Sequence, residues 1–324
     1  MSQTIRFHQV GGAEVLTWED VKVAEPGPGE LRVRHTVIGV NYIDIYHRTG
    51  AYPLSLPSGM GVEAAGVVVA VGAGADEFKV GDRIVYAGGP PGAYAEERLV
   101  PAARALKLPA GVSDDVAASL TFKGLTVEYL IRRCYPVKQG DVVLFHAAAG
   151  GIGSIACQWL KHLGATVIGT VDGEDKAAYA KANGCDHPIL YKTEDVVQRV
   201  KEITNGAGVS VVYDSIGKDT IAQSLQCLRP RGTLVSFGTV SGPTPPIDLA
   251  ELGSRGSLFV TRPSIAHYTA KREELVGGAN VLFDAIASGV VKPAKTTKYA
   301  LKDVQQVHRD LEAGKTSGSV VLVV

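Results

Sequence analysis

The sequence lacks an excess of charge of either sign, because its 33 Lys and Arg residues balance its 33 Asp and Glu residues. Without a net field, a protein neither concentrates polyanions nor binds an acidic membrane surface by charge alone. The chain also lacks an apolar run of the roughly 18 residues that span a bilayer, and residues 1–10 show no signal-peptide pattern. We therefore expect a cytoplasmic protein with neither nucleic acid nor a membrane as partner.

Cysteine is scarce, and its four positions lie far apart: Cys134, Cys157, Cys185 and Cys227. None forms a CxxC pair, so the sequence favours neither a disulfide framework nor a structural zinc site. The eight histidines are equally scattered and show no metal-ligand spacing. We expect no bound metal and assign no histidine to catalysis.

At 324 residues the chain is long enough for two domains, and 45% of its residues are apolar. Up to about Leu108, short β-type runs alternate with Gly and Pro, which indicates a mostly antiparallel, barrel-like domain. After Ser113, helical stretches alternate with strands, the pattern of a parallel sheet. The strands predicted for that sheet are rich in β-branched residues: 142–146, 166–170, 209–214, 233–237 and 257–261. Beyond Pro263 we predict a helix and then a final strand, 319–324.

The strongest local signal is the segment VVLFHAAAGGIG, residues 142–153, in which a buried strand runs into a glycine turn. A helix is predicted to follow over residues 154–163. Gly150 and Gly151 would let the backbone approach a pyrophosphate closely, and Gly153 would let the helix pack on the strand. Ala148 stands where the usual GxGxxG pattern has its first glycine, and glycine turns also occur for purely structural reasons. The strand–turn–helix context favours a dinucleotide site.

The choice of dinucleotide depends on the end of the second strand. Asp172 can bind the ribose hydroxyls of NAD, whereas Lys176 is placed to meet the 2′-phosphate of NADP. Tyr191 can add a hydroxyl or stack on the adenine. Alternatively, Lys176 is a solvated helix residue and Asp172 a turn former. These residues by themselves leave the choice open.

Five segments occur in an order that resembles the medium-chain dehydrogenase/reductase superfamily. They are GVNYIDIY (39–46), GVEAAGVV (61–68), GDRI (81–84), KGLTV (123–127) and AAAGGIG (147–153). Over almost its whole length the chain is similar to the zinc-free quinone oxidoreductases, the bacterial relatives of zeta-crystallin. Zinc-dependent relatives have a cysteine at the position of Asn41 and a histidine at that of Val62, just before Glu63. Both metal ligands are missing here.

The resemblance implies an α/β fold with a GroES-like barrel domain, residues 1–124, to which residues 263–324 return. A Rossmann domain with a doubly wound parallel sheet would occupy residues 125–262. The resemblance further implies NADPH as cofactor, hydride transfer to a quinone without a metal, and a homodimer whose contact is the edge strand 257–261. Two alternatives remain: a reductase of alkenals or enones, and a zeta-crystallin-like protein that binds single-stranded RNA or has a structural role.

The cofactor-binding residues predicted from the local pattern or from the resemblance are Asn41, Asp44, Thr126, Tyr129, Gly150, Gly151, Ile152, Asp172, Lys176, Tyr191, Ile216, Gly238, Ser241 and Ser264. Among them Asp172 departs from relatives that carry a small residue near this point, and the departure weighs against NADPH. For the acceptor pocket we predict Tyr46, Tyr52 and Arg262 as catalytic residues, since phenols stack on a quinone and donate to its oxygen.

Overall fold

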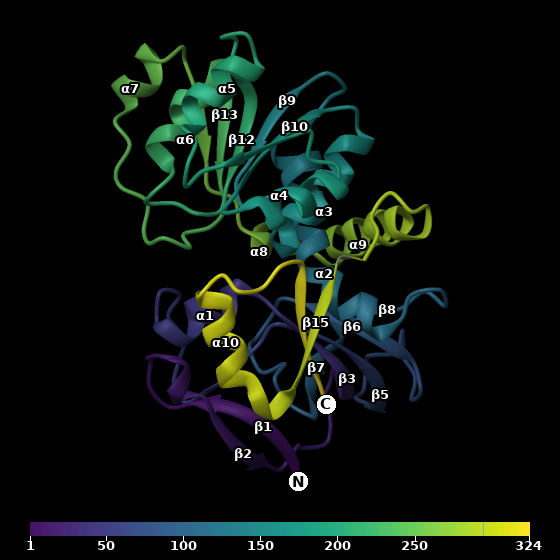
Figure 1. Cartoon of the computed structure of the whole chain (residues 1–324). Coiled ribbons are helices and arrows are strands. Elements are labelled where there is room, and N and C mark those ends of the chain that lie inside the picture. The colour runs from purple at the N-terminus through teal and green to yellow at the C-terminus, as the bar shows by residue number, and fades with distance from the viewer. Residues whose placement is uncertain (294) are drawn as a thin grey trace. The chain divides into compact units, whose positions relative to one another are not determined.

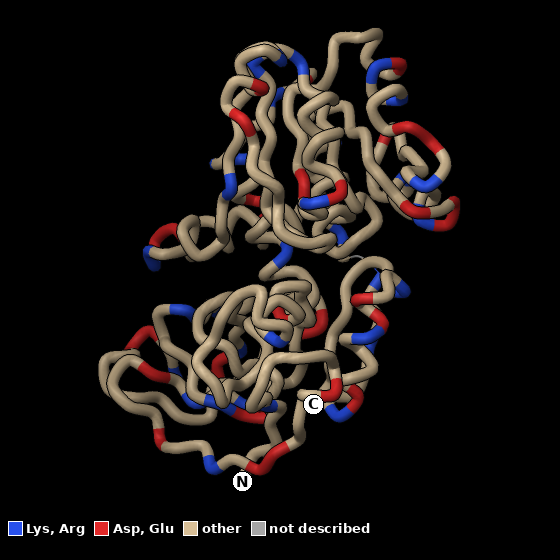
Figure 2. Tube along the Cα trace, turned by 90° about the vertical axis from the view of Figure 1, so that its left-hand side faces the viewer, with Lys and Arg blue, Asp and Glu red and all other residues tan. Residues whose placement is uncertain are grey.

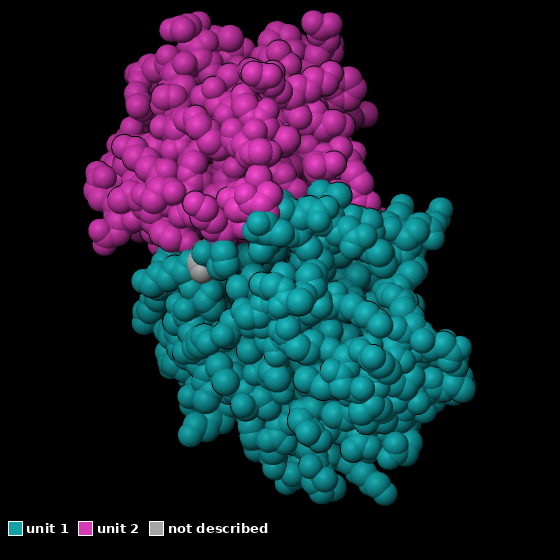
Figure 3. All heavy atoms as spheres, turned by 90° about the vertical axis from the view of Figure 1, so that its right-hand side faces the viewer, with its two compact units in different colours: residues 1–125, 268–287, 293–324 teal, residues 126–267, 288–292 magenta. Residues whose placement is uncertain are grey.

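The computed structural model describes residues 1–293 and 295–324, and the chain divides into two compact units (Figure 3). Unit 1 comprises Met1–Leu125, Tyr268–Ala287 and Pro293–Val324, and unit 2 comprises Thr126–His267 and Ser288–Lys292. This division differs from the predicted boundaries at three places: Leu125 groups with unit 1, and residues 263–267 and 288–292 group with unit 2.

Unit 1 is built on a mostly antiparallel sheet with the strand order β15-β16-β3-β5-β6-β8, in which β7 also pairs with β3 (Figure 1). Its strands are β3 (Glu30–Val40), β5 (Glu63–Val71), β6 (Arg83–Ala87), β7 (Glu97–Pro101), β8 (Ala105–Lys107), β15 (Thr296–Ala300) and β16 (Ser319–Val323). A smaller sheet joins β1 (Ser2–Phe7), β2 (Thr17–Val21) and β4 (Ser58–Gly59). Apolar side chains on the inward faces, such as Leu31, Ile38 and Leu322, form one core. The predicted antiparallel β domain is confirmed.

The helices of unit 1 are short except for two. They are η1 (Ala13–Val15), α1 (Tyr42–Thr49), η2 (Ala102–Arg104), α2 (Asp114–Glu128), α9 (Arg272–Ala287), η4 (Leu301–Asp303) and α10 (Val304–Glu312). Helix α1 ends at Gly50, whose φ of 81° is the left-handed conformation that suits glycine. The boundary between the units falls within α2. Between Pro263 and the last strand lie several helices and β15, so the prediction of one helix there was incomplete.

Unit 2 contains a parallel sheet with the strand order β11-β10-β9-β12-β13-β14 (Figure 1). Its strands are β9 (Val142–Phe145), β10 (Thr166–Val171), β11 (His187–Leu190), β12 (Val209–Asp214), β13 (Leu228–Ser236) and β14 (Phe259–Thr261). The chain reverses its direction of winding between β9 and β12, which is the order of a doubly wound, dinucleotide-binding sheet. The predicted Rossmann domain is confirmed.

Three strands of unit 2 differ from the prediction by two residues or more. Strand β13 begins at Leu228, five residues before the predicted start at Thr233. Strand β11 was missed because it has only four residues and includes Pro188, which lacks an N–H group and is tolerated at this edge position. Strand β14 begins two residues later than predicted. Ser257 has a φ of 57°, and a residue in the left-handed region cannot continue a strand.

Two pairs of helices cover opposite faces of this sheet (Figure 1). Helices α3 (Gly151–His162) and α4 (Glu174–Ala182) pack together on one face, and α5 (Val196–Ile203) and α6 (Ile221–Cys227) pack together on the other. The remaining helices are η3 (Tyr129–Cys134, a π-helix), α7 (Leu249–Ser254) and α8 (Ile265–Tyr268). Because both faces are covered, the central strands are almost uniformly apolar and buried.

The charged residues of both signs are interspersed along the trace of each unit (Figure 2). Many are paired, as in the ion pairs Arg32–Glu97 and Lys161–Asp186. Over residues 1–293 and 295–324, no helix combines the length and the apolar character that a membrane span requires.

Candidate functional site

The glycine turn of unit 2 leads from β9 into helix α3. The helix begins at Gly151, and its N-cap residue Gly150 has no side chain to cap the first turn. The first N–H groups of a helix have no acceptor within the helix, so an uncapped N-terminus is suited to bind an anion. A Cβ atom at Gly153 would lie 2.3 Å from the Ala147 carbonyl oxygen and 2.7 Å from Ala148 Cα. Glycine is therefore required at residue 153.

The alanine that replaces the usual first glycine has a partner on the next strand. Ala148 is fully buried, and its Cβ would lie 2.5 Å from a Cβ at Gly169 on β10. The absence of a side chain at Gly169 makes room for the methyl group of Ala148. The altered motif thus retains the close packing of strand, turn and helix. These residues fit a bound dinucleotide pyrophosphate.

The residues predicted to select the dinucleotide lie together at the ends of β10 and β11. Lys176 Nζ is 2.9 Å from Asp172 Oδ2, and both side chains are about three-quarters buried. Tyr191 directly follows β11 and is half exposed. Partial burial raises the pKa of Tyr191, and the Asp172 carboxylate adds to this shift. Asp172 and Lys176 form an ion pair with each other. Asp172 is therefore more than a turn former, and Lys176 is not a freely solvated lysine.

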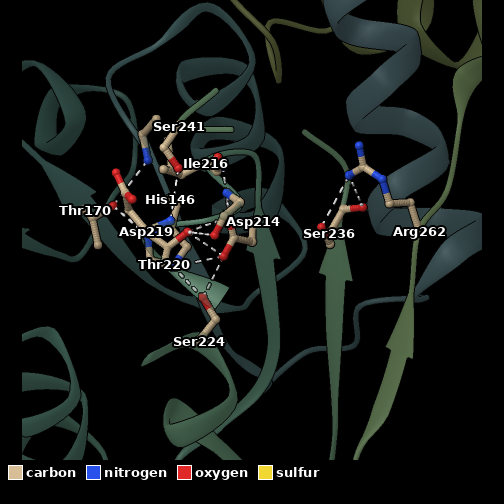
Figure 4. A network of polar contacts seen from close by, with 12 residues as sticks. His146, Thr170, Asp214, Ile216, Asp219, Thr220, Ser224, Ser236, Ser241 and Arg262 are labelled. Carbon is tan, nitrogen blue, oxygen red and sulfur yellow. Dashed lines mark hydrogen bonds and ion pairs between the residues drawn. The ribbon is translucent and has the colours of Figure 1, made fainter. Parts of the chain in front are cut away.

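A third group of predicted residues is organised by Asp214, which the sequence analysis did not select. Asp214 ends β12 and is fully buried. Its Oδ1 accepts hydrogen bonds from the backbone N–H groups of Ile216, at 2.9 Å, and Gly217, at 3.0 Å (Figure 4). The carbonyl oxygen of Ile216 in turn accepts from the N–H and the hydroxyl of Ser241, both at 2.9 Å. The loops that follow β12 and β13 are thereby joined.

Gly238 allows these two loops to approach each other. A Cβ atom at this residue would lie 2.4 Å from the Ser215 carbonyl oxygen. Arg262 supports the same region: its guanidinium donates to the carbonyl oxygens of Ser236, at 3.1 Å, and Gly238, at 3.2 Å. In Figure 4 Arg262 and Ser236 lie apart from the cluster around Asp214. The structure therefore places Arg262 at the end of β13.

The other predicted residues of unit 2 lie on helices or, for Ser264, directly before one. Thr126, on α2, and Tyr129, the first residue of the π-helix η3, are both buried. Ile152 lies in the first turn of α3. Ser264 precedes α8, and its hydroxyl accepts from the N–H of Ala266 at 3.3 Å. π-Helical turns are rare and recur at functional sites. The π-helix that begins at Tyr129 was not predicted from the sequence.

Unit 1 contains a buried polar cluster around Glu63. The Asn41 side chain donates to Glu63 Oε2 at 2.8 Å, and the backbone N–H of Phe122 donates to Oε1 at 2.6 Å. Lys123 Nζ lies 3.7 Å from Oε2. Burial raises the pKa of Glu63, and the Lys123 ammonium opposes this shift. Among the residues that the structure describes, no three His, Cys, Asp or Glu side chains form a group that could hold a metal ion.

Asp44 belongs to a second buried cluster in unit 1. Its Oδ2 accepts from the N–H of Asn41 at 2.9 Å and from the Tyr94 hydroxyl at 2.8 Å. Burial raises the pKa of Asp44 to about 7. The Tyr94 hydroxyl also lies 3.3 Å from Nε2 of His308, whose Nδ1 is 3.2 Å from Arg48. Burial, reinforced by Arg48, lowers the pKa of His308 to about 3.

The two tyrosines predicted for the acceptor pocket are in contact. The rings of Tyr46, on α1, and Tyr52 have centroids 4.9 Å apart at an angle of 47°. Tyr42 joins them with its ring centroid 5.2 Å from that of Tyr46. Burial raises the pKa of Tyr42 to about 12, so this phenol keeps its proton at neutral pH. The cluster offers flat aromatic surface together with hydroxyl groups.

A GroES-like β unit and a doubly wound parallel sheet with a glycine turn after its first strand define the class of the medium-chain dehydrogenases/reductases. Residues 27–110 match the model of the alcohol dehydrogenase GroES-like domain, and residues 151–270 match that of the zinc-binding dehydrogenases. The chain is 50% identical to a quinone oxidoreductase of Salmonella typhimurium over 100% of both chains. On this basis the chain belongs to the quinone oxidoreductase family.

Two further comparisons bear on the cofactor and the acceptor. The crystal structure of Escherichia coli quinone oxidoreductase complexed with NADPH has a TM-score of 0.97 and 48% identity, covering 99% of this chain and 100% of that one. A 2-haloacrylate reductase of Burkholderia sp is 48% identical over 98% of this chain and 97% of the relative. The resemblance stated from the motifs is confirmed.

Proposed function

We propose that the protein is a quinone reductase that uses NADPH and needs no metal. The observation that carries this proposal is the glycine turn at Gly153, which puts the uncapped N-terminus of α3 at the end of the first strand of a doubly wound sheet. NADPH, when bound, supplies the hydride that reduces the quinone. The N–H groups of Gly151 and Ile152 would bind its pyrophosphate, and Lys176 its 2′-phosphate.

Further cofactor contacts are proposed in each unit taken by itself. In unit 2 we assign the nicotinamide half of the cofactor to Thr126, Tyr129, Ile216, Gly238, Ser241 and Ser264. In unit 1 the proposed cofactor contacts are Asn41 and Asp44. Asn41 is oriented for this role by its hydrogen bond to buried Glu63. Asp172 and Tyr191 would complete the adenosine site, with Asp172 holding Lys176 in place by their ion pair.

For the acceptor we propose contacts with Tyr46 and Tyr52. Their adjacent rings can stack on a quinone, and their hydroxyls can donate to the oxygen on which negative charge develops. Quinones are strong electrophiles, so positioning and hydrogen bonding replace a Lewis acid. Arg262 would act by fixing Gly238 through its hydrogen bond to that carbonyl oxygen.

A second candidate function is the reduction of activated double bonds, which the similarity to a 2-haloacrylate reductase supports. Steady-state kinetics with NADPH and a panel of quinones, enones and haloacrylates separates the two. We expect kcat/KM for the best quinone to exceed that for the best enone or haloacrylate by at least ~10-fold. A preference for any double-bond substrate over all the quinones would contradict the first proposal.

Replacing Lys176 by alanine is expected to lower the affinity for NADPH by about 10-fold to 100-fold, the usual effect of losing a charge-assisted hydrogen bond. The affinity for NADH should change little, because NADH has no 2′-phosphate. Fluorescence titration measures both, and Lys181→Ala, an exposed lysine on the same helix, is the matched control. Equal affinities of the unmodified protein for NADH and NADPH would show that Asp172 selects the ribose instead.

We also propose a homodimer formed through β14. This strand lies at the edge of its sheet and exposes Phe259 and Val260, with Leu249 of the nearby α7 also exposed. An open edge with apolar side chains is protected when it pairs with a second copy. Light scattering after size exclusion should give twice the chain mass of 34.0 kDa, and Phe259→Asp should shift the protein toward monomer. A monomeric unmodified protein would rule the dimer out.

A further inference from the structure

A continuous chain of hydrogen bonds runs through the interior of unit 2, from the glycine turn to Asp214 (Figure 4). The N–H of Ala147 donates to Thr170 Oγ1 at 3.2 Å, and this hydroxyl lies 3.0 Å from His146 Nδ1. His146 Nε2 is 3.0 Å from Ser224 Oγ, and the Ser224 hydroxyl donates to Asp214 Oδ2 at 2.8 Å. His146, Thr170, Ser224 and Asp214 are all buried.

One arrangement of protons satisfies every member of this chain. Thr170 accepts the N–H of Ala147 and directs its own proton to His146 Nδ1. The imidazole then carries its proton on Nε2 and donates it to Ser224, whose hydroxyl proton goes to the carboxylate. Burial lowers the pKa of His146, with the Asp214 carboxylate opposing, which favours this neutral ring. Hydrogen bonds that all point one way reinforce one another.

The other oxygen of Asp214 holds the backbone of the loop after β12. Oδ1 accepts from the N–H groups of Ile216 and Gly217, and the Thr220 hydroxyl lies within 2.9 Å of both carboxylate oxygens. Ile216 is bonded to Ser241 in the loop after β13. One carboxylate therefore connects the loops that follow β12 and β13 with the chain that leads to the glycine turn.

The far end of the hydrogen-bond chain holds a strained residue. Ala147 has a φ of 54°, a left-handed conformation that is unfavourable for any residue with a Cβ atom. Its N–H is bonded to Thr170, and its carbonyl oxygen accepts from the N–H of Gly150 at 2.9 Å. These bonds fix the turn that positions the N-terminus of α3.

We propose that Asp214 is a positioning residue for the dinucleotide. It holds the loops that follow β12 and β13 in one arrangement before the cofactor arrives, while Ser224, His146 and Thr170 orient its carboxylate. The inference rests on the proposed NADPH-dependent function and extends it to residues that would not touch the cofactor. Preorganised loops bind more tightly because less ordering remains to be done on binding.

The two halves of the cofactor should respond differently to a change at Asp214. In a sheet of this order the first half binds the adenosine end, and the second half, which begins with β12, binds the nicotinamide end. Asp214 bonds directly to the loop of the second half through Ile216 and Gly217. A ligand that consists of the adenosine end alone, 2′,5′-ADP, therefore reports on general damage to the fold.

The test is a set of titrations with NADPH and with 2′,5′-ADP. Asp214→Asn keeps the size of the side chain but replaces one acceptor oxygen with an NH₂ group, so either Ser224 or the N–H groups of Ile216 and Gly217 lose their acceptor. We expect the Kd for NADPH to rise by about 10-fold to 100-fold and the Kd for 2′,5′-ADP to change by less than ~3-fold. Thermal unfolding of each variant accompanies the titrations.

Ser224→Ala interrupts the chain without removing the direct bonds of Asp214 to its loop, so a smaller rise in the Kd for NADPH is expected. Ser210→Ala, at another buried serine on β12, is the matched control and should bind NADPH normally. Unchanged NADPH affinity in both network variants, or an equal loss of both ligands, would overturn the inference. If Asp214→Asn does not fold, Ser224→Ala decides the question. Failure of the unmodified protein to bind NADPH would instead contradict the proposed function.

Discussion

Replacement of Gly153 by valine is expected to abolish measurable NADPH binding, with a Kd at least ~100-fold higher than that of the unmodified protein. The new Cβ would lie 2.3 Å from the Ala147 carbonyl oxygen and 2.7 Å from Ala148 Cα. Both are backbone atoms, so relief requires helix α3 to move away from the turn. Such overpacking costs about 1–3 kcal/mol, and the displaced helix would no longer present its N–H groups to the pyrophosphate.

Fluorescence titration measures this effect, and thermal unfolding separates it from a general loss of structure. Gly253→Val is a suitable control, because Gly253 lies on α7 and has open space where its Cβ would be. This control should bind NADPH normally. If Gly153→Val bound NADPH as tightly as the unmodified protein, the glycine turn would not be the pyrophosphate site.

The second large effect concerns the pH dependence of stability. The pKa of Asp44 is raised from 3.8 to about 7 by burial, so between these values the unfolded chain loses a proton that the native state keeps. The contribution of Asp44 to stability is therefore present at low pH and is lost as the pH rises from about 4 to 7. At about 1.4 kcal/mol for each pH unit, the loss is up to about 4 kcal/mol.

Asp44→Asn should remove this dependence, because an amide has no proton to lose in this range. Its carbonyl oxygen can take the place of Oδ2 and accept from Asn41 and Tyr94 as before. Urea unfolding at pH 5 and pH 8 gives the free energy of unfolding of both proteins. The value for the variant minus the value for the unmodified protein should be about 2–4 kcal/mol larger at pH 8 than at pH 5. The groups around Asp44, among them Tyr94, Glu63 and Lys123, are the same in both proteins, so the difference between the proteins isolates the change at Asp44.

Asp76→Asn provides the control for this measurement, since Asp76 is exposed in the same unit. The free energy of unfolding of this control should differ from that of the unmodified protein by the same amount at pH 5 and at pH 8. A stability difference for Asp44→Asn that does not change with pH would mean that Asp44 is ionised in the native state throughout this range.

The architecture of unit 2 could be predicted because its local patterns agree with its fold. Apolar β-branched strands such as β12 are buried on both faces, and the glycine turn after β9 stands between a strand and a helix, the context that favours a dinucleotide site. The exceptions have local causes: Pro188 in the short β11, and the left-handed Ser257 before β14. The ion pair of Asp172 with Lys176 joins two residues four apart, although the sequence analysis considered them as rivals for different dinucleotides.

The buried polar networks could not be predicted from one sequence. His146 reaches Ser224 across 78 residues, and Tyr94 reaches His308 across 214 residues. No periodicity or spacing connects such residues, because the fold alone brings them together. An aspartate at the end of a buried strand, as at Asp214, was the one local sign available, and it carries no information about its donors.

The most direct test of the proposed function is the initial rate of NADPH oxidation by the purified protein when a quinone is added in the presence of a metal chelator. We predict quinone-dependent oxidation that saturates in both substrates, is unaffected by the chelator and is faster with NADPH than with NADH. No acceleration over the uncatalysed reaction, or activity that returns only when zinc is added, would contradict the account of a metal-free, NADPH-dependent quinone reductase.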